Sequence, residues 1–198
     1  DVVTGGNRHS GGCAWVDYNG DYLPDLFVIN GSGIPHRLYR NEGGGTFSDV
    51  SSLVVKPNLA LESAGIACAD FDNDGDTDVL IAVDNPFINI NAFNTKTGGP
   101  NLLYVNQGDG TFIEDAAAWG IVDPRGWRNI SVNLSDIDRD GFVDAYMGVW
   151  APNNSAIHDR YNLMYLNNGT VFTVFTSGAE DGLETLTALF FDADMDLH

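Results

Sequence analysis

Residues 70–78 read DFDNDGDTD, a run in which five aspartates alternate with other residues. Carboxylates at positions 1, 3, 5 and 9 of such a loop, together with the backbone carbonyl of position 7, are able to converge on one hard cation the size of calcium. Gly75 at position 6 permits the sharp bend that this convergence needs. The stretch therefore predicts a calcium-binding turn.

Related runs recur along the chain. They read DYNGDYLPD at 17–25, DIDRDGFVD at 136–144 and DADMDLH at 192–198, where the chain ends. The first aspartates of successive runs lie about 53 to 66 residues apart, a spacing typical of blades, solenoid turns or arrays of modules. The sequence therefore predicts one repeated unit.

The candidate metal ligands follow from the loop positions. They are Asp17, Asn19, Asp21 and Asp25 in the first run, Asp70, Asp72, Asp74, Asp76 and Asp78 in the second, Asp136, Asp138, Asp140, Phe142 and Asp144 in the third, and Asp192, Asp194 and Asp196 in the fourth. Asp76 and Phe142 are expected to contribute their backbone carbonyls. Weaker binding is expected in the first run, where Tyr22 replaces the glycine and Asn19 removes a charge. In the fourth, Leu197 stands at the bend and the ninth position lies beyond the chain end.

Short apolar segments rich in β-forming residues flank each acidic run. They cover 12–16, 65–69 and 130–134 before the runs, and 26–29, 79–83 and 145–149 after them. Such pairs predict strands joined by the acidic loop as a hairpin.

Each repeat continues with a second hairpin signature. It reads LYRNEGGGTF at 38–47, LYVNQGDGTF at 103–112 and MYLNNGTVF at 164–172. The Asn and Gly residues are expected to supply positive φ angles, and the Tyr and Phe residues to face inward. Four strands per repeat are predicted, with repeats at about 13–52, 64–117, 129–177 and, truncated, 186–198 of one partial domain, 1–198.

The acidic loop between two apolar strands, joined to the second hairpin, resembles the FG-GAP or VCBS repeats of integrin-like β-propellers, and most closely the cartilage acidic protein branch and its bacterial relatives. The resemblance covers essentially the whole chain. It implies an all-β propeller of four-stranded antiparallel blades with structural calcium in the first hairpin loops. About three blades and the start of a fourth are expected here, as part of a ring of about seven. Further blades from the same protein, or self-assembly, would then cover the open ends.

Other interpretations of the acidic runs remain open. Acidic, Gly-rich turns are also found as solvated hairpin connections without metal. An EF-hand or dockerin pair is disfavoured, because position 12 would be Ile81 or Met147 within a predicted strand and no helices are indicated. The Gly-Gly-x-Gly pattern of RTX repeats is absent.

Composition restricts the partners. The chain has 198 residues, a net charge of −19 and only nine Lys and Arg residues, which argues against nucleic acid and anionic membranes. The sequence contains no apolar stretch of 18 residues, so no membrane-spanning helix is predicted. Calcium and a protein or glycan ligand are the expected partners. Cys13 and Cys68 are interpreted as buried free thiols, with a disulfide between repeats as the alternative.

Ligand contacts are expected in the unequal segments between the second and third strands, at 30–36, 84–100 and 150–162. Phe87, Phe93, Trp127 and Trp150 could stack on sugar rings or anchor a protein partner, although aromatic residues also pack in cores. His36 and His158 could perform acid–base chemistry or be exposed polar residues.

The sequence therefore favours a secreted or cell-surface recognition or adhesion module stabilised by calcium, with the periplasm as an alternative location. The alternative functions are the propeller domain of a carbohydrate-active enzyme of the polysaccharide lyase or dehydratase type, and a structural subunit of a surface filament. No assembled catalytic set is visible, so enzymatic activity is left open.

Overall fold

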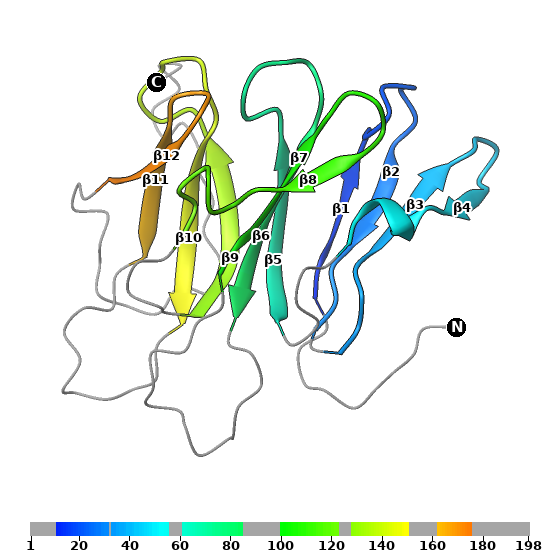
Figure 1. The fold of residues 1–198 in the computed structure, drawn as a ribbon, viewed down its shortest axis with the longest axis horizontal. Helices are drawn as coiled ribbons and strands as arrows, with labels where there is room; N and C mark the ends of the chain where they lie inside the picture. Colours follow the sequence, from blue (N-terminus) through cyan, green and yellow to red (C-terminus); the bar gives the residue numbers. More distant parts are fainter. Residues whose placement is uncertain are drawn as a thin grey trace, which may run out of the picture.

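The computed structural model describes residues 11–31, 33–55, 61–84, 100–122, 128–150 and 162–175, with Trp150 described by its backbone alone. These residues form three four-stranded antiparallel sheets, which lie side by side in Figure 1. Blade 1 consists of β1 (Cys13–Val16), β2 (Asp25–Val28), β3 (Arg37–Asn41) and β4 (Phe47–Asp49). Blade 2 consists of β5 (Glu62–Ala69), β6 (Asp78–Asp84), β7 (Leu102–Asn106) and β8 (Phe112–Glu114). Blade 3 consists of β9 (Arg128–Ser135), β10 (Asp144–Trp150), β11 (Leu163–Asn167) and β12 (Phe172–Phe175).

Within each blade the strands pair in chain order, as a meander. A one-turn 3-10 helix, η1 (Ser51–Leu53), follows β4. The all-β fold with blades of four antiparallel strands is therefore confirmed. Among the described residues, no helix combines the length and the apolar character that crossing a membrane requires.

The blades pack face to face. In β6 every residue is buried, because its two faces contribute to two different cores. Val79, Ile81 and Val83 pack with blade 1, and Leu80 and Ala82 pack with blade 3. The continuous apolar run that follows the second acidic loop is thus explained by burial on both sides of the central sheet.

The first strands of blades 2 and 3 approach closely at Gly65. A Cβ atom at this position would lie 2.8 Å from the Cα of Ser131 and 3.1 Å from the carbonyl oxygen of Ile130. Both are backbone atoms, which cannot move aside by a change of rotamer. Only glycine therefore fits between β5 and β9.

We expect Gly65→Ala to lower the free energy of unfolding by about 2 kcal/mol, the usual range for overpacking a core. Gly12 occupies the same position of blade 1, and a Cβ there would meet only the Ile66 Cγ2 atom at 3.4 Å. Gly12→Ala is the matched control and should change stability far less. Equal losses in chemical denaturation would contradict the close approach.

His36 is fully buried, so it is not the exposed polar residue that was one of the two expectations from the sequence. Its Nδ1 atom accepts a hydrogen bond of 3.2 Å from the backbone N–H of Asn30, just beyond β2. Asn101 and Asn162 occupy the same place in the other blades. Their Oδ1 atoms accept from the backbone N–H groups of Val83 (3.2 Å) and Val149 (2.9 Å). In each blade the side chain at this position therefore accepts a hydrogen bond from the backbone at the end of the second strand.

Two predictions of burial fail in blade 1. Phe47 is 44% exposed, whereas Phe172 at the same position of blade 3 is 2% exposed. Cys13 is exposed rather than buried, and Cys68 is half-buried; both are free thiols. The physical reason is that, among the described residues, no blade covers this face of blade 1, whereas the corresponding faces of blades 2 and 3 are covered.

Candidate metal centres

The three described acidic loops lie at one edge of the blades, at the top of the view in Figure 1. Loop 1 (residues 17–25) joins β1 to β2, loop 2 (70–78) joins β5 to β6, and loop 3 (136–144) joins β9 to β10. The strand register is the same at each loop. Val16 pairs with Asp25, Ala69 with Asp78 and Ser135 with Asp144. Position 9 of every loop is therefore the first residue of the second strand.

Hydrogen bonds from backbone N–H groups to side-chain oxygens of the same loop stabilise each turn. In loop 2, Asp70 at position 1 accepts hydrogen bonds from the backbone N–H groups of Asp74 (3.1 Å) and Gly75 (2.9 Å). Asp72 accepts from the N–H of Asp74, and Asp74 accepts from that of Asp76. Loops 1 and 3 repeat the bonds of positions 3 and 5. The acidic side chains therefore shape the loop as well as carry its charge.

Positive φ angles occur at two loop positions. At position 6 they are 66° for Tyr22, 98° for Gly75 and 94° for Gly141. Tyr22 therefore adopts a left-handed backbone conformation, which normally costs an L-residue about 1–2 kcal/mol. Position 4 also has positive φ, at Gly20, Asn73 and Arg139. The sequence indicated position 6 but not position 4.

Position 9 links the loop to the second hairpin. One oxygen of Asp78 accepts from the N–H of Phe71 at 3.0 Å, and the other accepts from the N–H of Asn106 at 2.8 Å. Asp25 and Asp144 make the equivalent pairs with Tyr18 and Asn41, and with Ile137 and Asn167. The buried carboxylates of position 9 therefore tie the first hairpin of each blade to the second.

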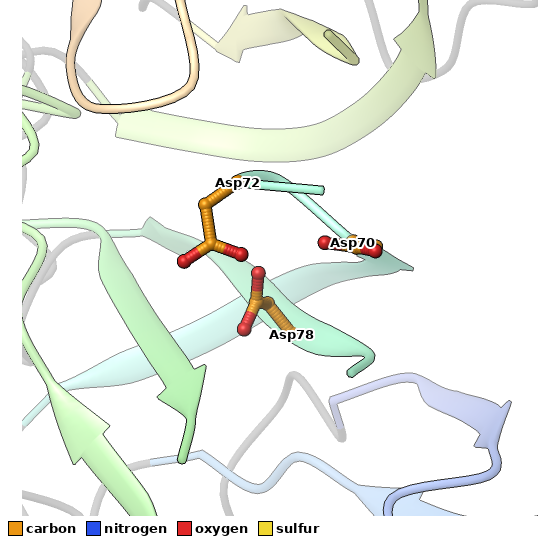
Figure 2. Close-up of side chains that lie close together, drawn as sticks. All are labelled: Asp70, Asp72 and Asp78. Atoms are coloured by element: carbon orange, nitrogen blue, oxygen red, sulfur yellow. The ribbon is translucent and has the colours of Figure 1, made fainter. Parts of the chain in front are cut away.

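Two of the loops bring three carboxylates together. The side chains of Asp70, Asp72 and Asp78 offer oxygens that lie within 4.8 Å of one another, and Figure 2 shows them converging. Asp136, Asp138 and Asp144 form the same group in loop 3. Asp74 and Asp140 at position 5 do not join these groups. Positions 1, 3 and 9 are thus the ones that converge.

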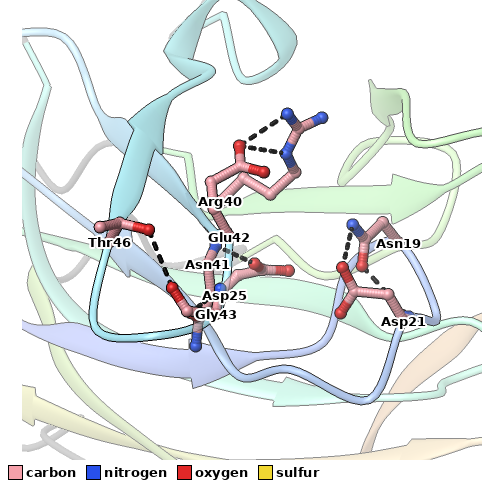
Figure 3. A network of polar contacts seen from close by, with 8 residues as sticks. All are labelled: Asn19, Asp21, Asp25, Arg40, Asn41, Glu42, Gly43 and Thr46. Atoms are coloured by element: carbon pink, nitrogen blue, oxygen red, sulfur yellow. Dashed lines mark hydrogen bonds and ion pairs between the residues drawn. The ribbon is translucent and has the colours of Figure 1, made fainter.

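Loop 1 is arranged differently. Position 3 is Asn19, so only Asp17 and Asp25 supply carboxylates at the positions that converge in loops 2 and 3. The Nδ2 atom of Asn19 donates to the Asp21 carboxylate at 2.9 Å, and its Oδ1 atom accepts from the backbone N–H of Asp21 (Figure 3). The Asn19 amide therefore hydrogen-bonds to one carboxylate oxygen of Asp21 and contributes no charge to the loop.

Burial changes the acidity of these carboxylates. It is the largest cause of the raised pKa of Asp78, which reaches about 7, and nearby Asp72 and Asp74 raise it further. The hydrogen bonds from Phe71 and Asn106 act in the opposite direction. Burial also raises the pKa of Asp25, Asp72 and Asp144. Ionising the loops of the metal-free protein is therefore costly.

The donor set fits a hard divalent cation. It consists of carboxylate oxygens with no nitrogen or sulfur ligand, which is the chemistry that calcium and magnesium prefer. Three carboxylates within 4.8 Å repel one another when ionised, and a bound cation would remove that repulsion. Asp70, Asp72 and Asp78, and Asp136, Asp138 and Asp144, are the residues that would hold it.

The stability of the metal-free protein should fall as the pH rises from about 4 to 7. The folded pKa of Asp78 is raised to about 7, above its ordinary value, so folding favours the protonated form in this window. In EDTA, we expect the melting temperature to be higher at pH 5 than at pH 7.5 by at least about 3 °C, the shift that about 1 kcal/mol produces in a domain of this size. The Asp78→Asn variant should lose much of this difference. If the Asp78→Asn variant keeps the full difference in melting temperature, other titrating groups cause the pH dependence.

Several predicted site residues lie outside the described residues. They are Phe87, Phe93, Trp127, His158, Asp192, Asp194 and Asp196, and the side chain of Trp150. The structure therefore gives no arrangement for the fourth acidic run or for the predicted aromatic contacts.

The asparagine that recurs in the second hairpin of each blade has a different role from the positive φ angle predicted for it. Asn41, Asn106 and Asn167 do not adopt positive φ; glycines of these hairpins do. Instead, each side-chain Oδ1 accepts from the N–H two residues later, and each Nδ2 donates to the carbonyl of loop position 8. Figure 3 shows Asn41 between Asp25 and Gly43. The signal in the sequence is the recurrence of Asn at the same position of each second hairpin signature.

Comparisons with known proteins agree with this architecture. The FG-GAP-like repeat family matches residues 4–81. Cartilage acidic protein 1 of Xenopus tropicalis is 29% identical over 207 residues, which cover 96% of this chain and 29% of that protein. The Mus musculus protein of the same name is 34% identical over 108 residues, covering 53% of this chain and 16% of the relative. The Homo sapiens protein is 45% identical over 58 residues, covering 29% of this chain and 9% of the relative.

The chain spans less than a third of the length of these relatives. The family match covers blade 1 and the loop 2 hairpin, and blades 2 and 3 repeat the same loops and hairpins. Residues 4–81 are therefore similar to FG-GAP-like repeats, the three four-stranded sheets are consistent with β-propeller blades, and the chain is similar to cartilage acidic protein 1.

Proposed function

We propose that the chain is a calcium-stabilised recognition or adhesion module, in which the ions are structural. The observation that carries this proposal is the convergence of three carboxylates in each of loops 2 and 3. Both groups lie at hairpin turns of the blades, where an ion would fix the turn and neutralise the repulsion between the carboxylates.

Calcium is favoured over magnesium by the shape of the loops. Calcium accepts six to eight oxygen ligands in flexible geometry, whereas magnesium requires near-ideal octahedral geometry and keeps several waters. Loops 2 and 3 each offer carboxylates from positions 1, 3 and 9 of a short turn, and the carbonyls of Asp76 and Phe142 are proposed to complete the set. Loop 1, with one carboxylate fewer, should bind more weakly.

A thermal melt tests this proposal. After treatment with EDTA, calcium is added to 100 times its dissociation constant, and each filled site should then add about 2.7 kcal/mol to stability. Magnesium at the same concentration should produce a much smaller rise in melting temperature. An equal response to both ions, or none, would overturn the assignment of calcium.

The recognition role is proposed for the segments between the second and third strands of each blade. The similarity to proteins named for cartilage supports an extracellular or cell-surface location, where millimolar calcium suits weak, carboxylate-rich sites. The ligand class is a protein or a glycan. Saturable binding on a glycan array or to matrix proteins, without chemical turnover, is expected. Unsaturated sugar products from acidic polysaccharides would instead favour an enzyme.

We also propose that the open face of blade 1 receives another propeller blade. Trp15 and Phe47 lie on this face with ring centroids 6.3 Å apart, and they are 61% and 44% exposed. The corresponding residues of blade 2, Cys68 and Phe112, pack against blade 1. The paired change Trp15→Ser and Phe47→Ser should be neutral in the isolated chain and destabilising in a longer protein that supplies the neighbouring blade. A neutral result in both would contradict the proposal.

A further inference from the structure

The acidic loops of neighbouring blades are joined by one buried side chain each. The Nδ2 atom of Asn106 in blade 2 donates to the backbone carbonyl of Tyr18 in loop 1 at 2.8 Å, across 88 residues of sequence. In the same way, Asn167 of blade 3 donates to the carbonyl of Phe71 in loop 2 at 2.7 Å. Asn106 and Asn167 are 2% and 1% exposed, so these bonds are shielded from water.

Each asparagine also holds a predicted metal ligand of its own loop. The backbone N–H of Asn106 donates to Asp78, and that of Asn167 donates to Asp144, both at 2.8 Å. Tyr18 and Phe71, whose carbonyls receive the amides, donate their own N–H groups to Asp25 and Asp78. The carboxylates of Asp25, Asp78 and Asp144 are therefore connected in series by hydrogen bonds. Asn106 joins loop 1 to loop 2, and Asn167 joins loop 2 to loop 3.

Aromatic packing follows the same route. The ring of Tyr18 lies 6.1 Å from that of Phe112, and the ring of Phe71 lies 5.5 Å from that of Phe172. Loops 2 and 3 have a second link, because the Nδ2 atom of Asn73 donates to the carbonyl of Gly141 at 2.9 Å. Gly20 stands at the position of Asn73 in loop 1 and has no side chain to make this bond.

We propose that Asn106 and Asn167 are positioning residues that make calcium binding cooperative between neighbouring blades. The proposal rests on the proposed calcium binding of loops 1, 2 and 3. An ion in loop 2 would order position 9 and the peptide of position 2, which are the two points where the asparagines attach. The neighbouring loop then loses less conformational freedom when it binds its own ion, and its affinity rises.

The experiment measures metal binding to loop 1 after loop 2 has been disabled. Terbium serves as the probe, because its emission is excited through a nearby tyrosine. Loop 1 contains Tyr18 and Tyr22, whereas loops 2 and 3 contain neither Tyr nor Trp. A Tyr22→Phe variant verifies the source of the emission. Asp72→Ala disables loop 2 and leaves the hydrogen bonds of Phe71, Asp78 and Asn106 in place, since Asp72 bonds to Asp74.

We expect Asp72→Ala to weaken terbium binding at loop 1 at least about fivefold, the lower end of common coupling between sites. In an Asn106→Ala background, Asp72→Ala should have no further effect. Asn73→Gly is the matched control: it removes a side chain of loop 2 that reaches loop 3, keeps the positive φ that Gly20 has at this position of loop 1, and should leave metal binding at loop 1 unchanged.

The outcomes separate the two proposals. If the unaltered protein binds neither terbium nor calcium, the proposed function fails. If loop 1 binds terbium with the same affinity before and after Asp72→Ala, the sites are independent and the coupling is wrong. This comparison decides the matter even if circular dichroism shows that Asn106→Ala does not fold.

Discussion

Replacing Asp78 by alanine should lower the free energy of unfolding by about 5 kcal/mol when calcium is present at 100 times its dissociation constant. Loss of the proposed calcium site would remove about 2.7 kcal/mol. The buried N–H groups of Phe71 and Asn106 also lose their acceptor, which costs at least about 1 kcal/mol each. Chemical denaturation at pH 7.5 measures the change.

In EDTA the same variant should show a smaller loss. The substitution then also removes a buried carboxylate whose pKa is raised to about 7, and this relief offsets part of the lost hydrogen bonding. Asp76→Ala is the matched control, because it removes one carboxylate from the same loop, while position 7 is proposed to contribute only its backbone carbonyl. Equal effects of the two variants in calcium would show that net charge, rather than the geometry of position 9, controls the loop.

Replacing Arg128 by methionine should lower the free energy of unfolding by about 3 kcal/mol. Arg128 at the start of β9 binds Asp84 at the end of β6 with two parallel hydrogen bonds, of which the Nη2–Oδ2 bond is 2.6 Å. The Asp84 side chain is only 6% exposed. Removing one partner of a buried pair is costly because the other charge stays behind in a poorly solvated place.

Two variants test this explanation. Asp84→Asn in the Arg128→Met background should recover part of the loss, since the remaining charge is removed. Arg40→Met is the control, because the Arg40–Glu42 pair is also 2.6 Å long but lies at the surface, with side chains 42% and 37% exposed, where such pairs contribute less than about 1 kcal/mol. A loss no greater for Arg128→Met than for Arg40→Met in urea titrations would contradict a stabilising role of the interblade pair.

Much of the fold could be predicted because its signals are local. The apolar segments beside the acidic runs became β1, β2, β5, β6, β9 and β10, and the second hairpins formed where their repeated signature stands. Strand periodicity and turn residues act within a few positions, so they are visible in one chain. The convergence of Asp70, Asp72 and Asp78 is local as well, since all three belong to one nine-residue turn.

The rest depended on contacts between residues far apart in sequence. Phe47, Phe112 and Phe172 stand at the same place of one repeated signature, yet Phe47 is exposed and Phe172 is buried. The difference arises because burial depends on whether another blade covers that face. His36 became a buried cap for the same reason, since its surroundings come from blade 2 as well as blade 1.

The sequence by itself therefore determined the β-strands, the three acidic turns and the repetition of one blade. Only the tertiary structure decided that Asn106 joins loop 2 to loop 1 and that Asn167 joins loop 3 to loop 2. The physical reason is that a spacing rule acts along the chain, whereas a hydrogen bond between residues 88 or 96 positions apart exists only once the blades are packed side by side.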